Sequence, residues 1–136
     1  MSSQDKKKEL LKYQAAVREA DLLEEEIQRW RSIAERTTAA IKLVPAGSDA
    51  GRSLETAVEQ INELAGQLGK RRQEAVQLRR TVETAIDGVE DDRLRNLLRM
   101  RYIDDNTWER IAVEMKCSYV HVCRLHGDSL KTLKML

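Results

Sequence analysis

The sequence predicts an all-α protein in which a long antiparallel helical hairpin, coiled-coil-like, precedes a small helix-turn-helix domain. Three observations lead to this fold class. Apolar residues recur at steps of three and four through most of the 136 residues. The single proline stands between two long periodic segments. Aromatic residues make up only 4% of the chain, with no phenylalanine, which is little for the core of a β-protein.

The first periodic segment predicts a helix from Leu10 to Ile41. Charged residues and glutamine fill most of the positions between its apolar members, as expected for one buried helix face. Pro45 has no amide hydrogen and disfavours helical geometry at Val44, so the helix must end there. The apolar members are Leu10, Tyr13, Val17, Ala20, Leu23, Ile27, Trp30, Ala34, Thr37 and Ile41.

The second periodic segment predicts a helix that Ser53 caps and that ends near Gly88. A short connection makes the two helices antiparallel neighbours. Their apolar faces are wider than one partner would cover, which predicts a homodimer through these N-terminal helices. The apolar members of the second series are Leu54, Val58, Ile61, Ala65, Leu68, Ala75, Leu78, Val82 and Ala85.

Three shorter helices are expected in the last third of the chain. The first spans about Arg93–Tyr102, and the next spans Trp108–Met115 with Thr107 as its cap. The last begins at Tyr119 after Ser118 and runs towards Leu133, which makes 119–133 the second helix of a helix-turn-helix pair. The predicted division is therefore 1–88 for the hairpin and 89–136 for the helix-turn-helix domain.

The spacing of small and apolar residues from Thr107 to Leu125 is typical of a helix-turn-helix. Ala112 is small where the two helix backbones approach each other, and Cys117 fills the corner between them. Val122 and Leu125 then seat the second helix on the first. In this arrangement the second helix can enter the major groove of DNA with its first turns nearest the bases.

The net charge of +1 conceals an asymmetry along the chain. Residues 93–136 hold nine Lys and Arg against five Asp and Glu, whereas residues 1–92 hold fifteen against eighteen. A polyanion such as duplex DNA would therefore meet the C-terminal third.

Residues from about Asp92 to Leu133 resemble region four of the sigma-70 family. The resemblance rests on the segments 97–102 and 107–112, on Ser118 and Val122, and on Ser129, Leu130 and Leu133. With its N-terminal hairpin, the whole chain is similar to phage-encoded, sigma-like proteins related to late-transcription regulators of the RinA and ArpU type. The resemblance implies a DNA-binding regulator of phage or prophage transcription. Nothing resembles the sigma segment that melts promoters, so a complete initiation factor is not expected.

The helix-turn-helix places two sets of side chains near DNA. Only Arg124 among the base-facing residues is a long basic donor, so direct readout of sequence is expected to be limited. Lys116 replaces the glycine usual at the corner and is expected at positive φ. The predicted base-facing residues are Tyr119, Val120, His121, Cys123 and Arg124, and the predicted phosphate contacts are Arg99, Arg101, Arg110, Lys116 and Lys131.

Two other functions remain open from the sequence. A small subunit of a phage DNA-packaging machine also joins a helix-turn-helix to long helices, but it assembles as a ring. A protein-interaction adaptor would instead dock its sigma-like domain on RNA polymerase. The few donors on the second helix keep the adaptor open. Size in solution separates the other two functions, since a monomer or dimer favours the regulator and a ring of many subunits favours the packaging protein.

The sequence does not indicate an enzyme. It has no nucleophile elbow and no phosphate-binding glycine loop, so neither a catalytic residue nor a cofactor is expected. Cys117, His121, Cys123 and His126 do not have a usual zinc-ligand spacing and would point to different faces of one helix, so no metal is expected. No segment has the features of a secretory signal peptide or of a membrane-spanning helix. The sequence therefore predicts a cytoplasmic protein with reduced cysteines.

Overall fold

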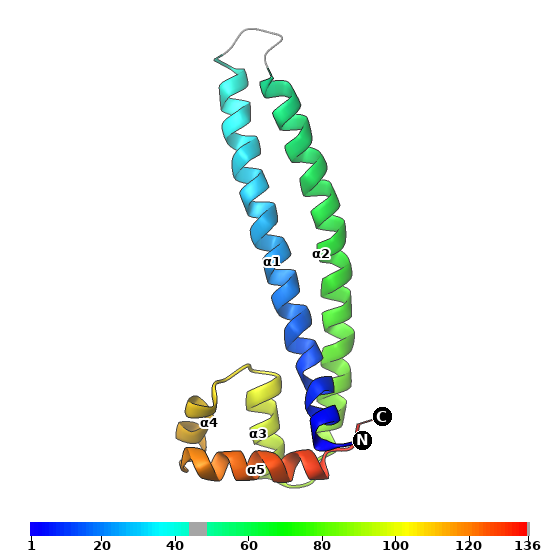
Figure 1. Cartoon of the computed structure of the whole chain (residues 1–136), viewed down its shortest axis with the longest axis vertical. Helices are drawn as coiled ribbons and strands as arrows, with labels where there is room; N and C mark the ends of the chain where they lie inside the picture. Colours follow the sequence, from blue (N-terminus) through cyan, green and yellow to red (C-terminus); the bar gives the residue numbers. More distant parts are fainter. Residues whose placement is uncertain (44–48, 136) are drawn as a thin grey trace. The chain divides into compact units, whose positions relative to one another are not determined.

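The computed structural model describes residues 1–43 and 49–135, and the elements in these ranges are all α-helices, without a strand. This confirms the predicted fold class. The predicted helix end at Pro45 lies outside the described residues. The helices are α1 (Ser3–Ile41), α2 (Ala50–Asp87), α3 (Asp92–Tyr102), α4 (Trp108–Met115) and α5 (Tyr119–Thr132) (Figure 1).

The start of α1 lies further toward the N-terminus than the apolar pattern indicated. The Ser2 hydroxyl accepts a hydrogen bond from the Asp5 amide at 3.1 Å, and the Asp5 carboxylate accepts one from the Ser2 amide at 3.1 Å. This reciprocal capping satisfies amides that have no partner within the helix. The apolar pattern begins only at Leu10, and so it could not locate a start that polar residues fix.

The start of α2 corrects the prediction that Ser53 is its cap. The helix begins at Ala50, and the Ser53 amide already donates to the Asp49 carbonyl at 3.1 Å. Ser53 therefore lies inside the first turn. Serine is accepted within a helix as well as at its start, so its presence alone did not fix the boundary.

The chain forms two compact units, and the division into 1–88 and 89–136 stays a prediction. One consists of Met1–Ala16 with Glu74–Leu136, and the other is Val17–Gln73. The first unit contains the start of α1 and the end of α2 together with α3, α4 and α5. These segments belong together because Leu10, Val82 and Ile86 lie in the same buried cluster as residues of α3 and α5. A fragment that begins at residue 89 would therefore lack part of its own core.

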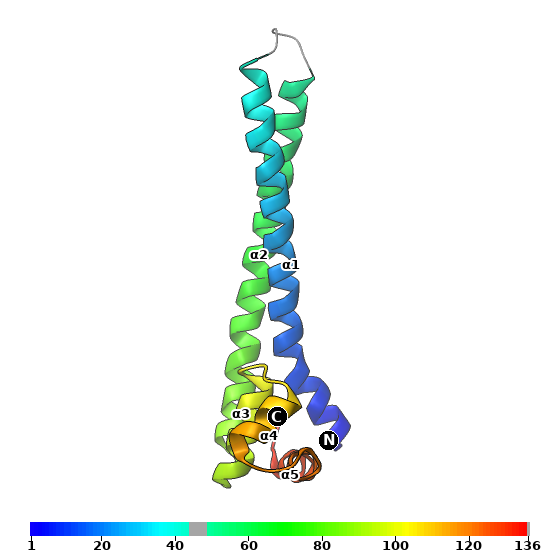
Figure 2. The ribbon, with the colours of Figure 1, turned by 90° about the vertical axis from the view of Figure 1, so that its left-hand side faces the viewer.

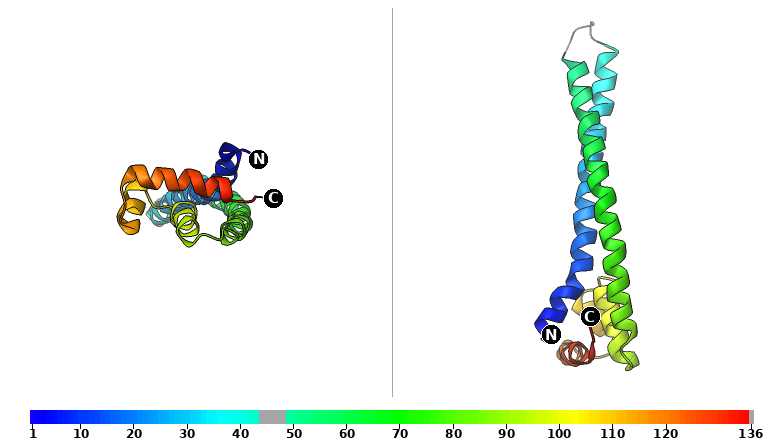
Figure 3. Two further views of the ribbon diagram at one scale, coloured as in Figure 1. Left: turned by 90° about the horizontal axis from the view of Figure 1, so that it is seen from below. Right: turned by 90° about the vertical axis from the view of Figure 1, so that its right-hand side faces the viewer.

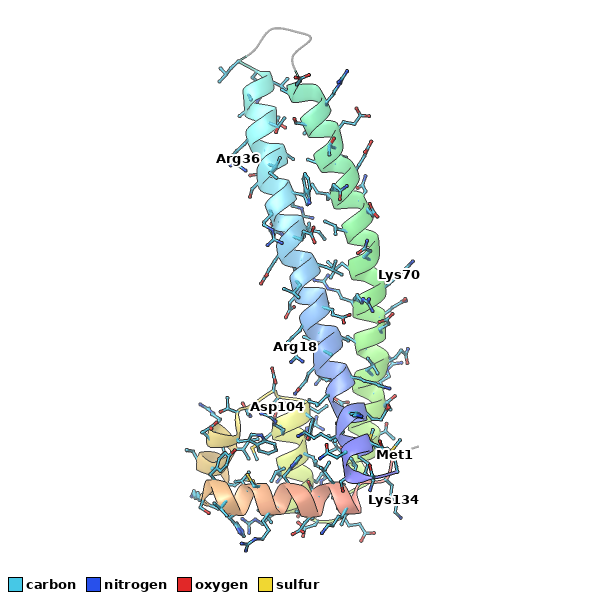
Figure 4. All side chains as sticks on the ribbon, in the orientation of Figure 1. Met1, Arg18, Arg36, Lys70, Asp104 and Lys134 are labelled. Carbon is cyan, nitrogen blue, oxygen red and sulfur yellow. The ribbon has the colours of Figure 1, made fainter. Side chains whose placement is uncertain are left out.

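Within the unit Val17–Gln73, α1 and α2 lie side by side and antiparallel (Figures 1 and 2). Ion pairs join the helices, among them Arg72 to Glu24 at 2.9 Å and Arg71 to Glu19 at 3.2 Å. Other charged side chains, such as Arg36 and Lys70, point outward from the pair (Figure 4). The buried core is small and consists of Ala20, Ile27, Leu64 and Leu68, with Leu23, Trp30 and Ile61 packed against it.

The inward face of α2 differs by one position from the predicted series at two places. Val58 and Ala65 were expected inside and are exposed, whereas Ala57 and Leu64 are buried. Both choices follow steps of three and four from Ile61, so periodicity alone fits either one. Packing against α1 selects the face that carries Leu64, the larger side chain.

In the other unit, α3, α4 and α5 pack together, with α4 beside the N-terminal end of α5 (Figure 3). Hydrogen bonds from Lys6 and Gln14 tie the N-terminal part of α1 to α5 and α3. The Lys6 ammonium donates to the Leu130 carbonyl at 2.8 Å, and the Gln14 amide donates to the Arg101 carbonyl at 2.7 Å. Lys6 thereby satisfies a carbonyl near the C-terminal end of α5 that lacks a partner within the helix.

Candidate nucleic-acid interface

Local capping residues fix where α4 and α5 begin. The Thr107 hydroxyl accepts from the Arg110 amide at 3.2 Å, and the Ser118 hydroxyl accepts from the His121 amide at 3.1 Å. Both residues have extended backbone geometry, as a cap requires. The two predicted caps are confirmed, and the start of α5 is therefore set by a local interaction.

The corner between the helices has the left-handed backbone expected at Lys116, with φ 55° and ψ 44°. The Cys117 amide donates to the Ala112 carbonyl at 3.1 Å, which closes the last turn of α4. The half-buried Cys117 side chain packs on the cluster formed by Leu97, Ile111 and Val122, and so it fills the corner as predicted.

Replacing Lys116 by glycine is expected to stabilise the fold. A residue with a Cβ atom is strained at this φ and glycine is not. We expect Lys116→Gly to be more stable than Lys116→Ala by about 1 kcal/mol in urea unfolding. Both variants lose the same charge, so the comparison isolates the backbone effect. Equal stability of the two variants would mean that the corner carries no strain.

Three buried side chains seat α5 on the other helices of its unit. Val122, Leu97 and Ile111 are each fully buried and in one cluster, and Ala112 lies beside them. Leu125 packs against this cluster and also against the larger core of the unit. The predicted inward face of α5 is therefore confirmed, and its rotation about its own axis is fixed.

That rotation leaves four of the five predicted base-facing residues on the surface. Tyr119 is 49% and Val120 66% exposed, and Cys123 and Arg124 are also exposed. They form two neighbouring ridges, Tyr119 with Cys123 and Val120 with Arg124, each four residues apart. His121 is half-buried and lies at the edge of this face. We call the four exposed residues the α5 face.

The hydroxyl of Tyr119 remains a hydrogen-bond donor on the α5 face. The neighbouring Cys123, by its electrostatic and hydrogen-bond interaction with the phenol, raises the pKa of Tyr119, and Glu109 contributes in the same direction. The phenol is therefore protonated at neutral pH. With the Arg124 guanidinium it supplies the stronger donors of the face, while Val120 supplies an apolar surface.

The predicted phosphate contacts lie in different environments. Arg110 is 66% exposed and 3.6 Å from Glu114, and Lys116 and Lys131 are exposed. Arg99 is half-buried and 3.7 Å from the Asp87 carboxylate. Lys116 adjoins the start of α5, whereas Lys131 lies in its last turn. The structure therefore brings only part of this set close to the α5 face.

Arg101 makes contacts within the protein that the sequence did not indicate. Its guanidinium donates to the Asn106 carbonyl at 2.9 Å and lies 4.4 Å from the centre of the Trp108 ring. A cation over an indole face is attracted by the ring's quadrupole. Arg101 thus holds the turn between α3 and α4.

A cluster of three rings joins α5 to α3 and α4, and sequence reasoning missed it. A hydrogen bond of 2.7 Å joins the Tyr102 hydroxyl to His126 Nε2, and the Trp108 ring meets His126 edge-on at 4.6 Å between centres. Burial, with Lys7 and Arg101 nearby, lowers the pKa of His126 to about 4. Burial also raises the pKa of Tyr102 to about 12. Both rings are therefore neutral at neutral pH.

His126 is expected to make the fold sensitive to acid. Its pKa of about 4 in the folded state lies below the ordinary value of 6.5. The unfolded chain therefore binds a proton first, and stability falls as the pH drops from about 6.5 to about 4. We expect a loss of about 1–2 kcal/mol, after allowing for the partial exposure of the ring. Urea unfolding at several pH values measures it.

The control for this acid effect is a pair of variants. His126→Gln, which does not titrate, should remove the loss between pH 6.5 and 4, whereas His121→Gln should retain it. If His126→Gln lost stability over this range as steeply as the parent, the effect would belong to other groups.

Two kinds of feature are absent from the described part of the chain. Across residues 1–43 and 49–135, no three His, Cys, Asp or Glu side chains come together as metal ligands would. In the same ranges, no helix combines the length and the apolar character that crossing a bilayer requires.

Together, α4, the corner at Lys116 and α5 define a helix-turn-helix pair within an all-helical protein. The chain belongs to the family described as "Protein of unknown function (DUF1492)", whose model matches residues 51–134. No curated protein matches the chain, and no solved structure does. The matched range includes α3, α4 and α5 and most of α2.

Proposed function

We propose that this protein is a DNA-binding transcriptional regulator of phage or prophage type, similar to sigma region four, which presents the α5 face to the major groove. The main support for this proposal is the exposure pattern of α5. The first two turns of α5 expose Tyr119, Val120, Cys123 and Arg124, while Val122 on the opposite side is fully buried. A recognition helix needs this combination of a fixed inner face and an accessible outer face.

The distribution of charge supports the same function. From Lys116 to Gly127 the chain has no acidic residue, and Lys116 stands directly before the capped start of α5. The helix N-terminus also attracts phosphate through its unpaired amides. The exposed Arg110 lies in the first turn of α4 and would add a phosphate contact.

The test is binding of the full chain to a random-sequence duplex, followed by fluorescence anisotropy from about 50 to about 200 mM salt. Three or four exposed cations at phosphates predict a slope of roughly −3 to −4 in log affinity against log salt. Arg110→Ala should make the slope shallower by about one. Absence of binding at about 50 mM salt would contradict the proposal.

The adaptor that docks on RNA polymerase remains the second candidate, and a specific observation favours it. Val113 on α4 is 74% exposed, and Val120 and Tyr119 are exposed on α5. Exposed apolar side chains are common at the centre of protein interfaces. An adaptor would bind polymerase and show no salt-dependent affinity for duplex DNA, so the same titration separates the two functions.

We also propose that the protein is a homodimer through its N-terminal helices. Leu22 on α1 and Val58 on α2 are large apolar residues on the surface of the unit Val17–Gln73. Their burial against a second copy would stabilise a dimer. Light scattering should give twice the mass of the 15.6 kDa chain at high concentration. A monomer would contradict the dimer, and a ring of many copies would favour the packaging subunit.

A further inference from the structure

Val120 is an apolar side chain at a position where a DNA reader usually has a polar one. It is 66% exposed in the first turn of α5, while Val122, two residues later, is completely buried. Neither fold stability nor helix capping requires a valine at this position, because Ser118 makes the cap and Val122 makes the core contact. Its contribution is therefore to the α5 face.

Arg124 lies one helical turn after Val120 on the same ridge. Side chains four residues apart are separated by about 5–6 Å at their Cβ atoms. Base pairs of duplex DNA are spaced by about 3.4 Å along the axis. Two side chains of one ridge therefore reach base pairs that are one or two steps apart.

We propose that Val120 contacts the 5-methyl group of a pyrimidine in the major groove, one or two base pairs from the base that Arg124 contacts. This inference rests on the proposed DNA-binding function. The 5-methyl group is the one apolar feature that base edges present in the major groove. Thymine carries it in ordinary DNA, and 5-methylcytosine carries it in methylated DNA.

The charge around Val120 favours an anionic partner such as DNA over a neutral or basic protein surface. Lys116 precedes it, Arg124 follows it, and no carboxylate lies between them in the sequence. A methyl group on a base is always flanked by phosphates, so an apolar residue between two cations matches it. The α5 face thus combines phosphate attraction, one guanidinium donor and one methyl contact.

The experiment begins with selection of a preferred duplex from a random pool by the full chain. Each thymine of that duplex is then replaced singly by deoxyuridine, which removes only the methyl group. At one thymine position we expect this replacement to lower the affinity of the unsubstituted protein for the duplex about fourfold, the loss that corresponds to one buried methyl group. The Val120→Ala variant should bind the selected duplex more weakly than the unsubstituted protein does. Its affinity should not fall further when that thymine is replaced by deoxyuridine.

Val113→Ala is the matched control. Val113 is also an exposed valine, but it lies on α4, outside the α5 face. This variant should keep the fourfold sensitivity of the parent to deoxyuridine. Circular dichroism of both alanine variants should be that of the parent, since both side chains are exposed.

A further pair of duplexes identifies the source of the methyl group. At the sensitive position, cytosine is compared with 5-methylcytosine. Tighter binding to 5-methylcytosine means that the methyl group is read on either base, and equal binding means that thymine is the specific source.

The possible results distinguish a failure of the methyl contact of Val120 from a failure of the proposed DNA-binding function. A chain that binds no duplex contradicts the proposed function as a whole. A chain that binds duplex DNA but shows no position sensitive to deoxyuridine overturns the methyl contact alone. Val120→Ala with the same sensitivity as the parent also overturns it.

Discussion

We expect Val122→Asp to unfold the unit that contains α3, α4 and α5. The Val122 side chain is completely buried in one cluster with Leu97 and Ile111. An aspartate there would be a charge without a partner in an apolar environment, at a cost of about 3–5 kcal/mol. A loss of this size is comparable to the whole stability of many domains. Thermal and urea unfolding followed by circular dichroism measure it.

Val120→Asp is the matched control for this substitution. The same change two residues earlier places the carboxylate on the surface, because Val120 is 66% exposed. Its free energy of unfolding should stay within about 0.5 kcal/mol of the parent. If Val122→Asp were as stable as Val120→Asp, the rotation of α5 described above would be wrong.

The second large effect is on binding. Arg124→Ala should lower the affinity for the preferred duplex by roughly 5- to 150-fold, or about 1–3 kcal/mol, if the guanidinium reads a guanine. The fold should be unchanged because Arg124 is exposed and lies on the side of α5 away from the buried Val122. Competition binding with the preferred and a random-sequence duplex measures the effect.

Arg110→Ala distinguishes base contacts from phosphate contacts. It should weaken binding to the preferred and the random-sequence duplex by the same factor, whereas Arg124→Ala should reduce the preference between them. A folded Arg124→Ala that retained the full preference would exclude Arg124 as a base reader. The adaptor function would then become the better account of the α5 face.

The parts of the site that depend on local sequence could be predicted. Thr107 and Ser118 are caps whose hydrogen bonds reach only three residues along the chain. Lys116 is forced to positive φ by the short turn that it occupies. The burial of Val122 follows from helical periodicity once the start of α5 is known. The residues that make these interactions lie within about ten positions of one another, so the interactions can be predicted from the sequence alone.

The parts that depend on contacts between distant segments could not be predicted. Nothing near Lys6 or Gln14 indicates that they bond to carbonyls of Leu130 and Arg101. For the same reason the sequence did not indicate that Leu10 and Val82 share a core with residues of α3 and α5. Periodicity also allowed two neighbouring faces of α2, and only packing chose between them.

Arg101 illustrates the same limit within the site. Its charge and its place near the helix-turn-helix made it a candidate for phosphate, which remains a prediction. Its contacts to Asn106 and to the Trp108 ring depend on how α3 and α4 meet. A side chain already held by two internal partners is less available to a ligand.

The α5 face is the surface that we propose to meet DNA. Amide chemical shifts of the isotopically labelled full chain, recorded during titration with a duplex at low salt, test this proposal most directly. We predict that the largest changes fall on residues 118–124, with smaller ones near Arg110 and Lys116, and that residues 49–73 of the hairpin do not change. Changes confined to the hairpin, with 118–124 unaffected, would contradict the account.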